Sequence, residues 1–136
     1  MLRAVLDTNV VVSALRSRRG PAFRLLSLVG TGRFEISLSV ALALEYEEVA
    51  RRSTPVSGDE LDTILAYLCS RAQRQRIFFL WRPSTPDPGD EMVVDLAVAA
   101  RATHLVTYNV RHLSGVKRFG IRVVRPPEFL AEIGES

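Results

Sequence analysis

MLRAVLDTNVVVSALRS, residues 1–17, is an apolar run that ends in a carboxylate and continues at once as a helix-forming segment. The pattern predicts a strand from Leu2 to Asp7 and a helix from there to about Leu15. In an open parallel sheet, ligands bind just beyond the carboxyl ends of the strands. Asp7 therefore stands where a side chain faces a ligand rather than the core, although helix-capping and turn-forming uses of aspartate are at least as common.

Short β-branched runs alternate with longer helical stretches along the rest of the chain. This alternation is typical of an α/β fold in which a parallel sheet is covered by helices. Further strands are predicted at FEISLS (34–39), IFFLW (77–81), HLVTY (104–108) and IRVV (121–124). Helices are predicted over 21–29, 40–52, 57–74 and 88–102, in a short turn after 108, and from 126 onward.

Capping signals mark several of the helix starts. Ser37 or Ser39 is the expected N-cap of the helix that follows the second strand. Ser57 has capping-box spacing to the glutamate three residues further on. Asp87 precedes Pro88 in the pattern of an N-cap followed by proline at the first helical position.

Length and composition indicate one soluble globular domain over residues 1–136, because 136 residues with 47% hydrophobic and 24% charged side chains suffice for an ordinary core. No segment approaches the ~18 uninterrupted apolar residues that a membrane span needs. We therefore expect a cytoplasmic protein that does not associate with a membrane. Cys69 is the single cysteine, which excludes an intrachain disulfide and a thiolate zinc cluster.

The formal net charge is +3, and Lys117 is the single lysine among 18 basic residues. Arginine presents a fixed fork of donors that suits phosphate, so the charge is compatible with a nucleic-acid partner. Solvated helix faces carry similar runs, and charge alone leaves both interpretations open. Two groups of arginines are the candidates for following a nucleic-acid backbone: Arg16, Arg18 and Arg19, and Arg71, Arg74 and Arg76.

Acidic residues occur inside segments that are otherwise apolar. Glu45 lies in the predicted helix of residues 40–52, and Asp95 lies in the run MVVDLAVAA. Burying an unpaired carboxylate costs several kcal/mol, so we expect Glu45 to face a cleft or a partner, and Asp95 needs a metal, a cation or a hydrogen-bond partner in the fold. Asp90 lies in the first turn of the helix that contains Asp95, where complementing the helix dipole is the alternative role.

Carboxylates from separate segments, without histidine or cysteine, form a hard oxygen donor set that selects Mg²⁺ or Mn²⁺. Such ions activate a water and neutralise charge on a phosphodiester, so the acids and the arginines together predict a metal-dependent nuclease. The sequence lacks a dinucleotide fingerprint, a P-loop and a G-x-S-x-G motif. His104 and His112 do not stand at a metal-binding spacing from the acids, and each is interpreted as structural or exposed.

Four segments occur in an order that resembles a known family: LDTNVVVSAL, SVALALEYEEVARR, DPGDEMVVDLAVAARATHLVTYNVRHL and GIRVVRPPEFL. They resemble the PIN-domain proteins, in particular the toxin components of toxin–antitoxin pairs that are related to the VapC-type toxins. The resemblance spans nearly the whole chain. It implies a three-layer α/β/α sandwich with a central, mainly parallel sheet, Mg²⁺- or Mn²⁺-dependent ribonuclease activity, a homodimer, and inhibition by an antitoxin protein.

The resemblance also implies roles for single residues. Asp7, Glu45 and Asp90 match the first, second and third catalytic acids, which hold the metal. Asn109 stands where many members have a fourth aspartate, and this is a departure from the family pattern. Because asparagine adds no charge, either the metal affinity is lower or Asp95 supplies the missing carboxylate.

Three polar residues are implied to support the acids. Thr8 and Thr107 match hydroxyl positions that orient the acids, and each has an alternative role as a cap or strand residue. Asn9 directly follows Thr8 and is counted with them.

Three functions are compatible with these residues. The first is hydrolysis of RNA phosphodiester bonds, with one or two divalent ions activating a water and arginines positioning the backbone. The second is a PIN-like module of weakened or absent activity that binds RNA or a protein, an alternative that Asn109 keeps open. The third is a phosphorylatable receiver-like domain, which requires a lysine after a late strand, and Lys117 fits that requirement badly.

Overall fold

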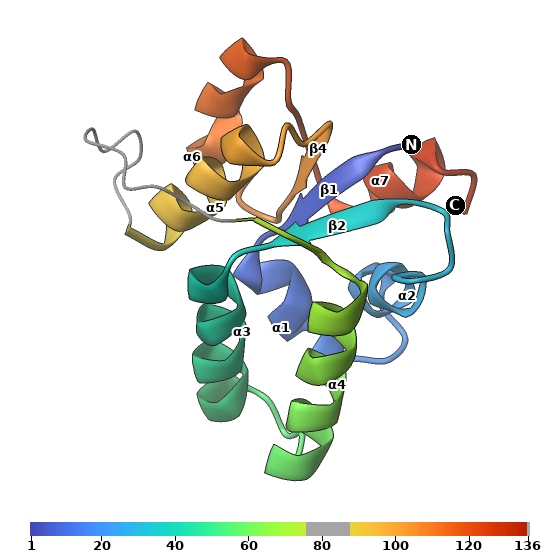
Figure 1. Ribbon diagram of the computed structural model, residues 1–136. Helices are drawn as coiled ribbons and strands as arrows, with labels where there is room; N and C mark the ends of the chain where they lie inside the picture. Colours follow the sequence, from blue (N-terminus) through green and yellow to red (C-terminus); the bar gives the residue numbers. More distant parts are fainter. Residues whose placement is uncertain (76–87, 136) are drawn as a thin grey trace.

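The computed structural model describes residues 1–75 and 88–135, and for residues 88–91 it describes the backbone alone. Strands and helices alternate over this part of the chain, as the sequence predicts (Figure 1). The strands are β1 (Arg3–Leu6), β2 (Glu35–Leu38), β3 (Gln73–Arg74), β4 (His104–Val106) and β5 (Arg122–Val124). The helices are α1 (Thr8–Arg16), α2 (Pro21–Ser27), α3 (Val40–Ser53), α4 (Gly58–Arg71), α5 (Pro88–Ala99), α6 (Val110–Leu113) and α7 (Pro126–Glu132), with a 3₁₀ helix η1 (Ser114–Phe119) after α6.

The described strands form one five-stranded sheet in the order β3-β2-β1-β4-β5, and every pair is parallel. β1 is the central strand: Ala4 pairs with Ile36 of β2 on one side and with His104 of β4 on the other. Later strands are therefore added on both sides of β1: β2 and β3 on one side, and β4 and β5 on the other. The strand order reverses between β1 and β4, and the crevice at the carboxyl ends of the strands at such a switch point is where open α/β sheets bind ligands.

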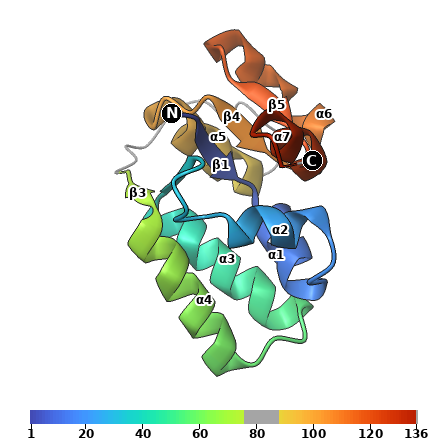
Figure 2. The same cartoon turned by 90° about the vertical axis from the view of Figure 1, so that its right-hand side faces the viewer.

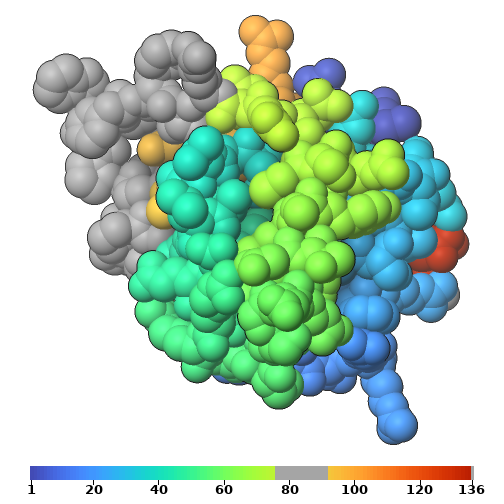
Figure 3. All heavy atoms as spheres, turned by 60° about the horizontal axis from the view of Figure 1, so that its bottom comes forward, coloured from blue at the N-terminus to red at the C-terminus, as the bar shows by residue number. Residues whose placement is uncertain are grey.

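Helices cover both faces of the sheet, which confirms the predicted α/β/α sandwich (Figure 1). On one face α1 contacts both α2 and α3, α3 contacts α4, and α2 contacts α7. Figure 2 shows this layer from the side, and Figure 3 views its surface, where α3 and α4 lie next to each other. α5 and α6 lie on the other side of the strands (Figure 1), and α5 contacts β1 and β2.

The core consists of the apolar side chains between these layers. β1 is buried from Ala4 to Leu6 because a central parallel strand is covered on both faces. The apolar face of α2, which includes Ala22 and Leu25, is also buried inside the chain. Intrachain packing therefore accounts for this face of α2. No helix in the described ranges is long and apolar enough to cross a membrane.

Side-chain caps place two helix starts. Ser39 is the N-cap of α3, with its Oγ accepting from the Leu42 N–H at 3.1 Å, whereas Ser37 is a buried residue of β2. Ser57 caps α4, and its Oγ accepts from the Glu60 N–H at 3.2 Å. The capping-box spacing thus predicted the start of α4 correctly.

The fourth helix was predicted to extend to residue 74, and this end is wrong, because the last predicted residues form a strand. Helix α4 ends at Arg71, and Gln73 and Arg74 form β3, which pairs with Ser37 and Leu38 of β2. Glutamine and arginine favour helix locally, but the open edge of β2 offers backbone hydrogen bonds that a longer helix would leave unmade. The predicted strand 77–81, Arg76 and the predicted cap Asp87 lie outside the described residues.

A buried tyrosine joins α3 to the central strand. Tyr46 is 2% exposed, and its hydroxyl donates to the carbonyl oxygen of Leu6, the last residue of β1. Burial raises the pKa of Tyr46 well above its usual value, and the negative charges of Asp7 and Glu45 raise it further. The phenol is therefore neutral and available as a donor.

We predict that Tyr46→Phe destabilises the protein by about 1–2 kcal/mol, because a buried carbonyl loses its donor without a change in side-chain shape. Urea unfolding measures the change. Tyr67→Phe is the matched control: the Tyr67 hydroxyl also donates to a carbonyl, that of Val29, but the residue is 44% exposed. Equal losses in the two variants would show that the bond to Leu6 has no special importance.

Candidate active site

Asp7 lies at the junction of β1 and α1 and serves both elements. Its backbone N–H donates to the Val106 carbonyl of β4 at 2.9 Å, which extends the sheet by one bond. Its side chain caps α1, with Oδ1 accepting from the Thr8 N–H at 2.8 Å. Asp7 is 7% exposed, so a charged group is held nearly buried at the carboxyl end of the central strand.

Thr107 holds the second oxygen of Asp7 from the neighbouring strand. It follows β4, is fully buried, and its Oγ1 donates to Asp7 Oδ2 at 2.7 Å. The same Oγ1 accepts from the backbone N–H of Asn109 at 2.9 Å. Each oxygen of the Asp7 carboxylate therefore has a donor from a different part of the chain, which sets the orientation of the group.

Asn9 connects α1 to the segment after β4. Its Oδ1 accepts from the Tyr108 N–H at 3.2 Å, and its Nδ2 lies 3.5 Å from Thr107 Oγ1. The two supporting residues Asn9 and Thr107 thus lie in one hydrogen-bonded group with Asp7. This group holds the segment after β4 against the start of α1.

Glu45 approaches the same edge from α3. Its Oε2 accepts from the hydroxyl of Thr8 at 2.9 Å, and the side chain is half-buried. Thr8 is adjacent to Asp7 and donates to both acids, through its N–H to Asp7 and through its hydroxyl to Glu45. Within the described part of the chain Glu45 forms no ion pair. Two carboxylates that lie 38 positions apart in the sequence are thus brought together by one threonine.

Helix α5 carries two further candidate acids, Asp90 and Asp95. Asp90 lies in the first turn of α5 as predicted, and its side chain lies outside the described part of the structure. Asp95 is half-buried on the same helix, with its Oδ1 buried. Since α5 contacts both β1 and α3, the helix runs beside the elements that bear Asp7 and Glu45.

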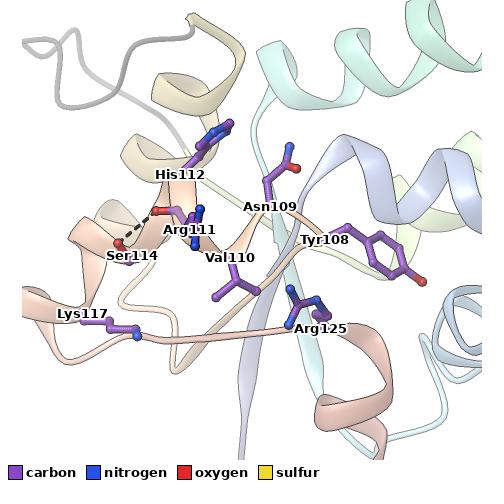
Figure 4. Close-up of a pocket in the computed structure, with 8 residues that line it drawn as sticks. All are labelled: Tyr108, Asn109, Val110, Arg111, His112, Ser114, Lys117 and Arg125. Atoms are coloured by element: carbon purple, nitrogen blue, oxygen red, sulfur yellow. Dashed lines mark hydrogen bonds between the residues drawn. The ribbon is translucent and has the colours of Figure 1, made fainter.

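Asn109 lies between the acids and a basic pocket. It follows the end of β4 as the N-cap of α6, and its side chain is exposed. It lines a pocket of about 490 Å³ together with several basic residues (Figure 4). The lining residues are Tyr108, Asn109, Val110, Arg111, His112, Ser114, Lys117 and Arg125.

The basic residues of this pocket differ from the arginines that the sequence suggested. Arg16 donates to the Ser53 carbonyl, Arg18 pairs with Glu60, and Arg71 stacks over the Tyr67 ring. These contacts are typical of solvated helix surfaces. The sequence feature that could have predicted this pocket is the position of Arg111 and Arg125, which closely follow the strands HLVTY and IRVV.

The two histidines have separate environments. His104 is buried in β4, where its Nε2 lies 3.1 Å from Glu132 Oε2 and its Nδ1 lies 2.8 Å from Thr103 Oγ1. His112 is exposed on α6. One histidine is therefore structural and the other exposed, as the sequence interpretation expected.

The donors at the acidic edge fit a hard divalent cation. Asp7 and Glu45 supply carboxylate oxygens, and Thr8 and Thr107 supply hydroxyls that hold those carboxylates in place. Oxygen donors of this kind suit Mg²⁺ or Mn²⁺. Among the described side chains no group of three histidine, cysteine, aspartate or glutamate residues gathers, and Asp90 is not among those side chains.

Comparisons with known proteins agree with this architecture. A family model described as "PIN domain" matches residues 3–111. In three dimensions the chain is similar to one in the crystal structure of VapBC2 from Rickettsia felis bound to a DNA fragment from their promoter, with a TM-score of 0.58. The match has 18% sequence identity and covers 90% of this chain and 97% of the other, so it shows the fold. No curated protein matches the chain significantly in sequence.

We predict that Thr107→Val destabilises the protein by about 1.5–3 kcal/mol, because a buried carboxylate loses a charge-assisted donor while the side-chain volume is kept. Thr107→Ser retains the hydroxyl and is expected to recover most of the loss. Chemical unfolding of both variants tests this. A serine variant as unstable as the valine variant would indicate that packing, and not the bond to Asp7, is what Thr107 contributes.

Proposed function

Because the chain belongs to the PIN domain family, we propose that it is a divalent-metal-dependent ribonuclease and the toxin of a toxin–antitoxin pair. PIN domains are nucleases, which hydrolyse phosphodiester bonds. The observation that carries the proposal is the pairing of Asp7 and Glu45 through Thr8 at the carboxyl end of β1. All three residues lie within the segment that matches the family model.

In this proposal Asp7, Glu45 and Asp90 hold one or two Mg²⁺ or Mn²⁺ ions. A divalent cation, when bound, lowers the pKa of a water and offsets the charge that develops on the phosphate. The chain's own contribution is to orient the carboxylates. Thr107 and the Thr8 N–H hold Asp7, and the Thr8 hydroxyl holds Glu45, so neither acid has to reorganise when the cation binds.

Asn109 and Asp95 complete the proposed set. Asn109 can offer a carbonyl oxygen but no charge, so its presence lowers the negative charge of the site relative to a fourth aspartate. Asp95 is the candidate for restoring that charge, since it lies on the helix of Asp90 and has a buried carboxylate oxygen. The exposed Asn109 is then accessible to a substrate.

The proposed partners are an RNA substrate, an antitoxin protein and a second copy of the chain. The antitoxin is supported by the family resemblance and by the structural neighbour, a chain of VapBC2 from Rickettsia felis. The homodimer and the cytoplasmic location follow from the family resemblance.

A second candidate function is RNA binding with little or no cleavage. The observation that favours it is Asn109, which leaves the site one acid short of the family pattern. The two functions differ in turnover: a nuclease requires the metal, whereas a binding module binds RNA in the presence of a chelator without cutting it.

We predict that the purified protein cleaves a mixed RNA pool with Mg²⁺ or Mn²⁺ and not with chelator. Asp7→Asn should lower the cleavage rate by about 100-fold or more, because it removes a metal-binding charge while keeping the cap acceptor of α1. Glu48→Gln is the control, an exposed acid on the helix of Glu45 that pairs with Arg52. Unchanged cleavage by Asp7→Asn would exclude Asp7 as a catalytic acid.

We further predict that Glu45→Gln weakens Mn²⁺ binding by about tenfold or more, as expected when a ligand charge is lost. Isothermal titration calorimetry of the protein without RNA measures this directly. Glu48→Gln should bind Mn²⁺ as the parent does. Equal affinities in the parent and Glu45→Gln would place the metal away from α3.

A further inference from the structure

A basic pocket lies directly beside the acidic edge. Its charged members come from three consecutive elements: Arg111 from α6, Lys117 from η1, and Arg125 from the residue after β5. We propose that this pocket binds backbone phosphates of the RNA strand next to the bond that is cut. The inference rests on the proposed nuclease function and assigns its substrate a second contact site.

The fold brings these cations together although they share neither one helix face nor one run of sequence. Figure 4 shows the side chains of Arg111, Lys117 and Arg125 around Val110. The Ser114 hydroxyl donates to the Arg111 carbonyl at 3.0 Å and closes the turn between α6 and η1. Val116 of η1 is buried, which anchors the segment that bears Lys117. The pocket is therefore built on packed backbone.

Among the described residues, carboxylates neutralise the cations of the pocket less than they neutralise several surface arginines. Within the described residues Arg111 and Lys117 form no ion pair, and Arg125 lies 4.0 Å from Glu128, with both side chains more than half exposed. In contrast, Arg18, Arg51 and Arg122 each contact a carboxylate closely. Three cations gathered in one hollow, two of them without an ion pair among the described residues, favour a polyanionic ligand.

Backbone hydrogen bonds place the pocket at a defined position relative to Asp7. The Thr107 N–H donates to the Val124 carbonyl at 2.9 Å, so Arg125 directly follows the residue that pairs with Thr107. On the other side, the Asn109 N–H donates to Thr107 Oγ1, and the same Oγ1 donates to Asp7. Thr107 therefore contacts both the acidic edge and the wall of the pocket.

This juxtaposition matches the chemistry of a nucleic-acid strand. Guanidinium groups bind phosphate oxygens in a bidentate manner, and a lysine ammonium adds a point charge. Ser114 and Asn109 add neutral donors to the same hollow. A strand whose reacting phosphate lies at the carboxylates, with divalent ions between, has its flanking phosphates within reach of cations. Contacts of this kind position the strand without reading its bases.

The test is equilibrium binding of a fluorescent single-stranded RNA oligonucleotide in chelator, so that cleavage does not interfere. The variants are Arg111→Gln, Lys117→Gln, Arg125→Gln and the triple combination, measured over a range of salt concentrations. Each single change should weaken binding and lower the slope of log Kd against log salt by about 0.7, and the triple change by about 2. Arg118→Gln is the matched control, because Arg118 is an exposed neighbour of Lys117 that does not line the pocket.

An unchanged affinity and salt slope in the triple variant would overturn the proposal, as would tighter binding of an acidic peptide than of RNA by the parent protein. The replaced side chains are exposed, so the triple variant is expected to fold as Arg118→Gln does. Thermal unfolding of both variants checks this. Metal-dependent cleavage is assayed in parallel. RNA binding that depends on the pocket, without any cleavage, would support the pocket and contradict the nuclease. Cleavage and binding that are both unaffected by the triple change would support the nuclease and contradict the pocket.

Discussion

The hydrogen bond from the Thr107 hydroxyl to Asp7 Oδ2 is the interaction on which the site depends. Asp7 is nearly buried, and its carboxylate needs donors for its oxygens, since an ionised group without them is costly to bury. Thr107 supplies one donor from the residue after β4, and the Thr8 N–H supplies another from the start of α1. The same contacts therefore stabilise the junction of β1, β4 and α1 and set the direction of the Asp7 carboxylate.

Glu45 and Asn109 take their positions from this junction. Glu45 is held by the hydroxyl of Thr8, while its neighbour Tyr46 is fixed to the last carbonyl of β1. Asn109 is held through its backbone N–H by Thr107. The acidic edge and the basic pocket thus share one support, and a change at Thr107 acts on both. In the proposed function an RNA strand meets two kinds of site here: carboxylates that hold divalent ions at the acidic edge, and cations that bind phosphate in the basic pocket.

Local sequence patterns predicted most of the fold because the residues that mark a helix start or a strand lie within a few positions of it. Ser57 is recognised by its spacing to a glutamate, and β1 by an apolar run that ends in Asp7. The same reasoning failed at Gln73 and Arg74, where the open edge of β2 outweighed helix propensity. It also favoured runs of arginine along the sequence, although Arg18 is paired on the surface and the pocket draws its cations from separate elements.

The sequence by itself determined that a parallel sheet covered by helices would form, and that Asp7 would stand at the end of a strand. It also indicated the family to which the chain belongs, and that resemblance predicts Glu45 and Asp90 as further acids of the site. The tertiary structure decided which hydroxyl holds which carboxylate, and that Arg111, Lys117 and Arg125 share a pocket. The physical reason is that strand order and register bring distant segments together, and no spacing along the chain records the distance between two strand ends.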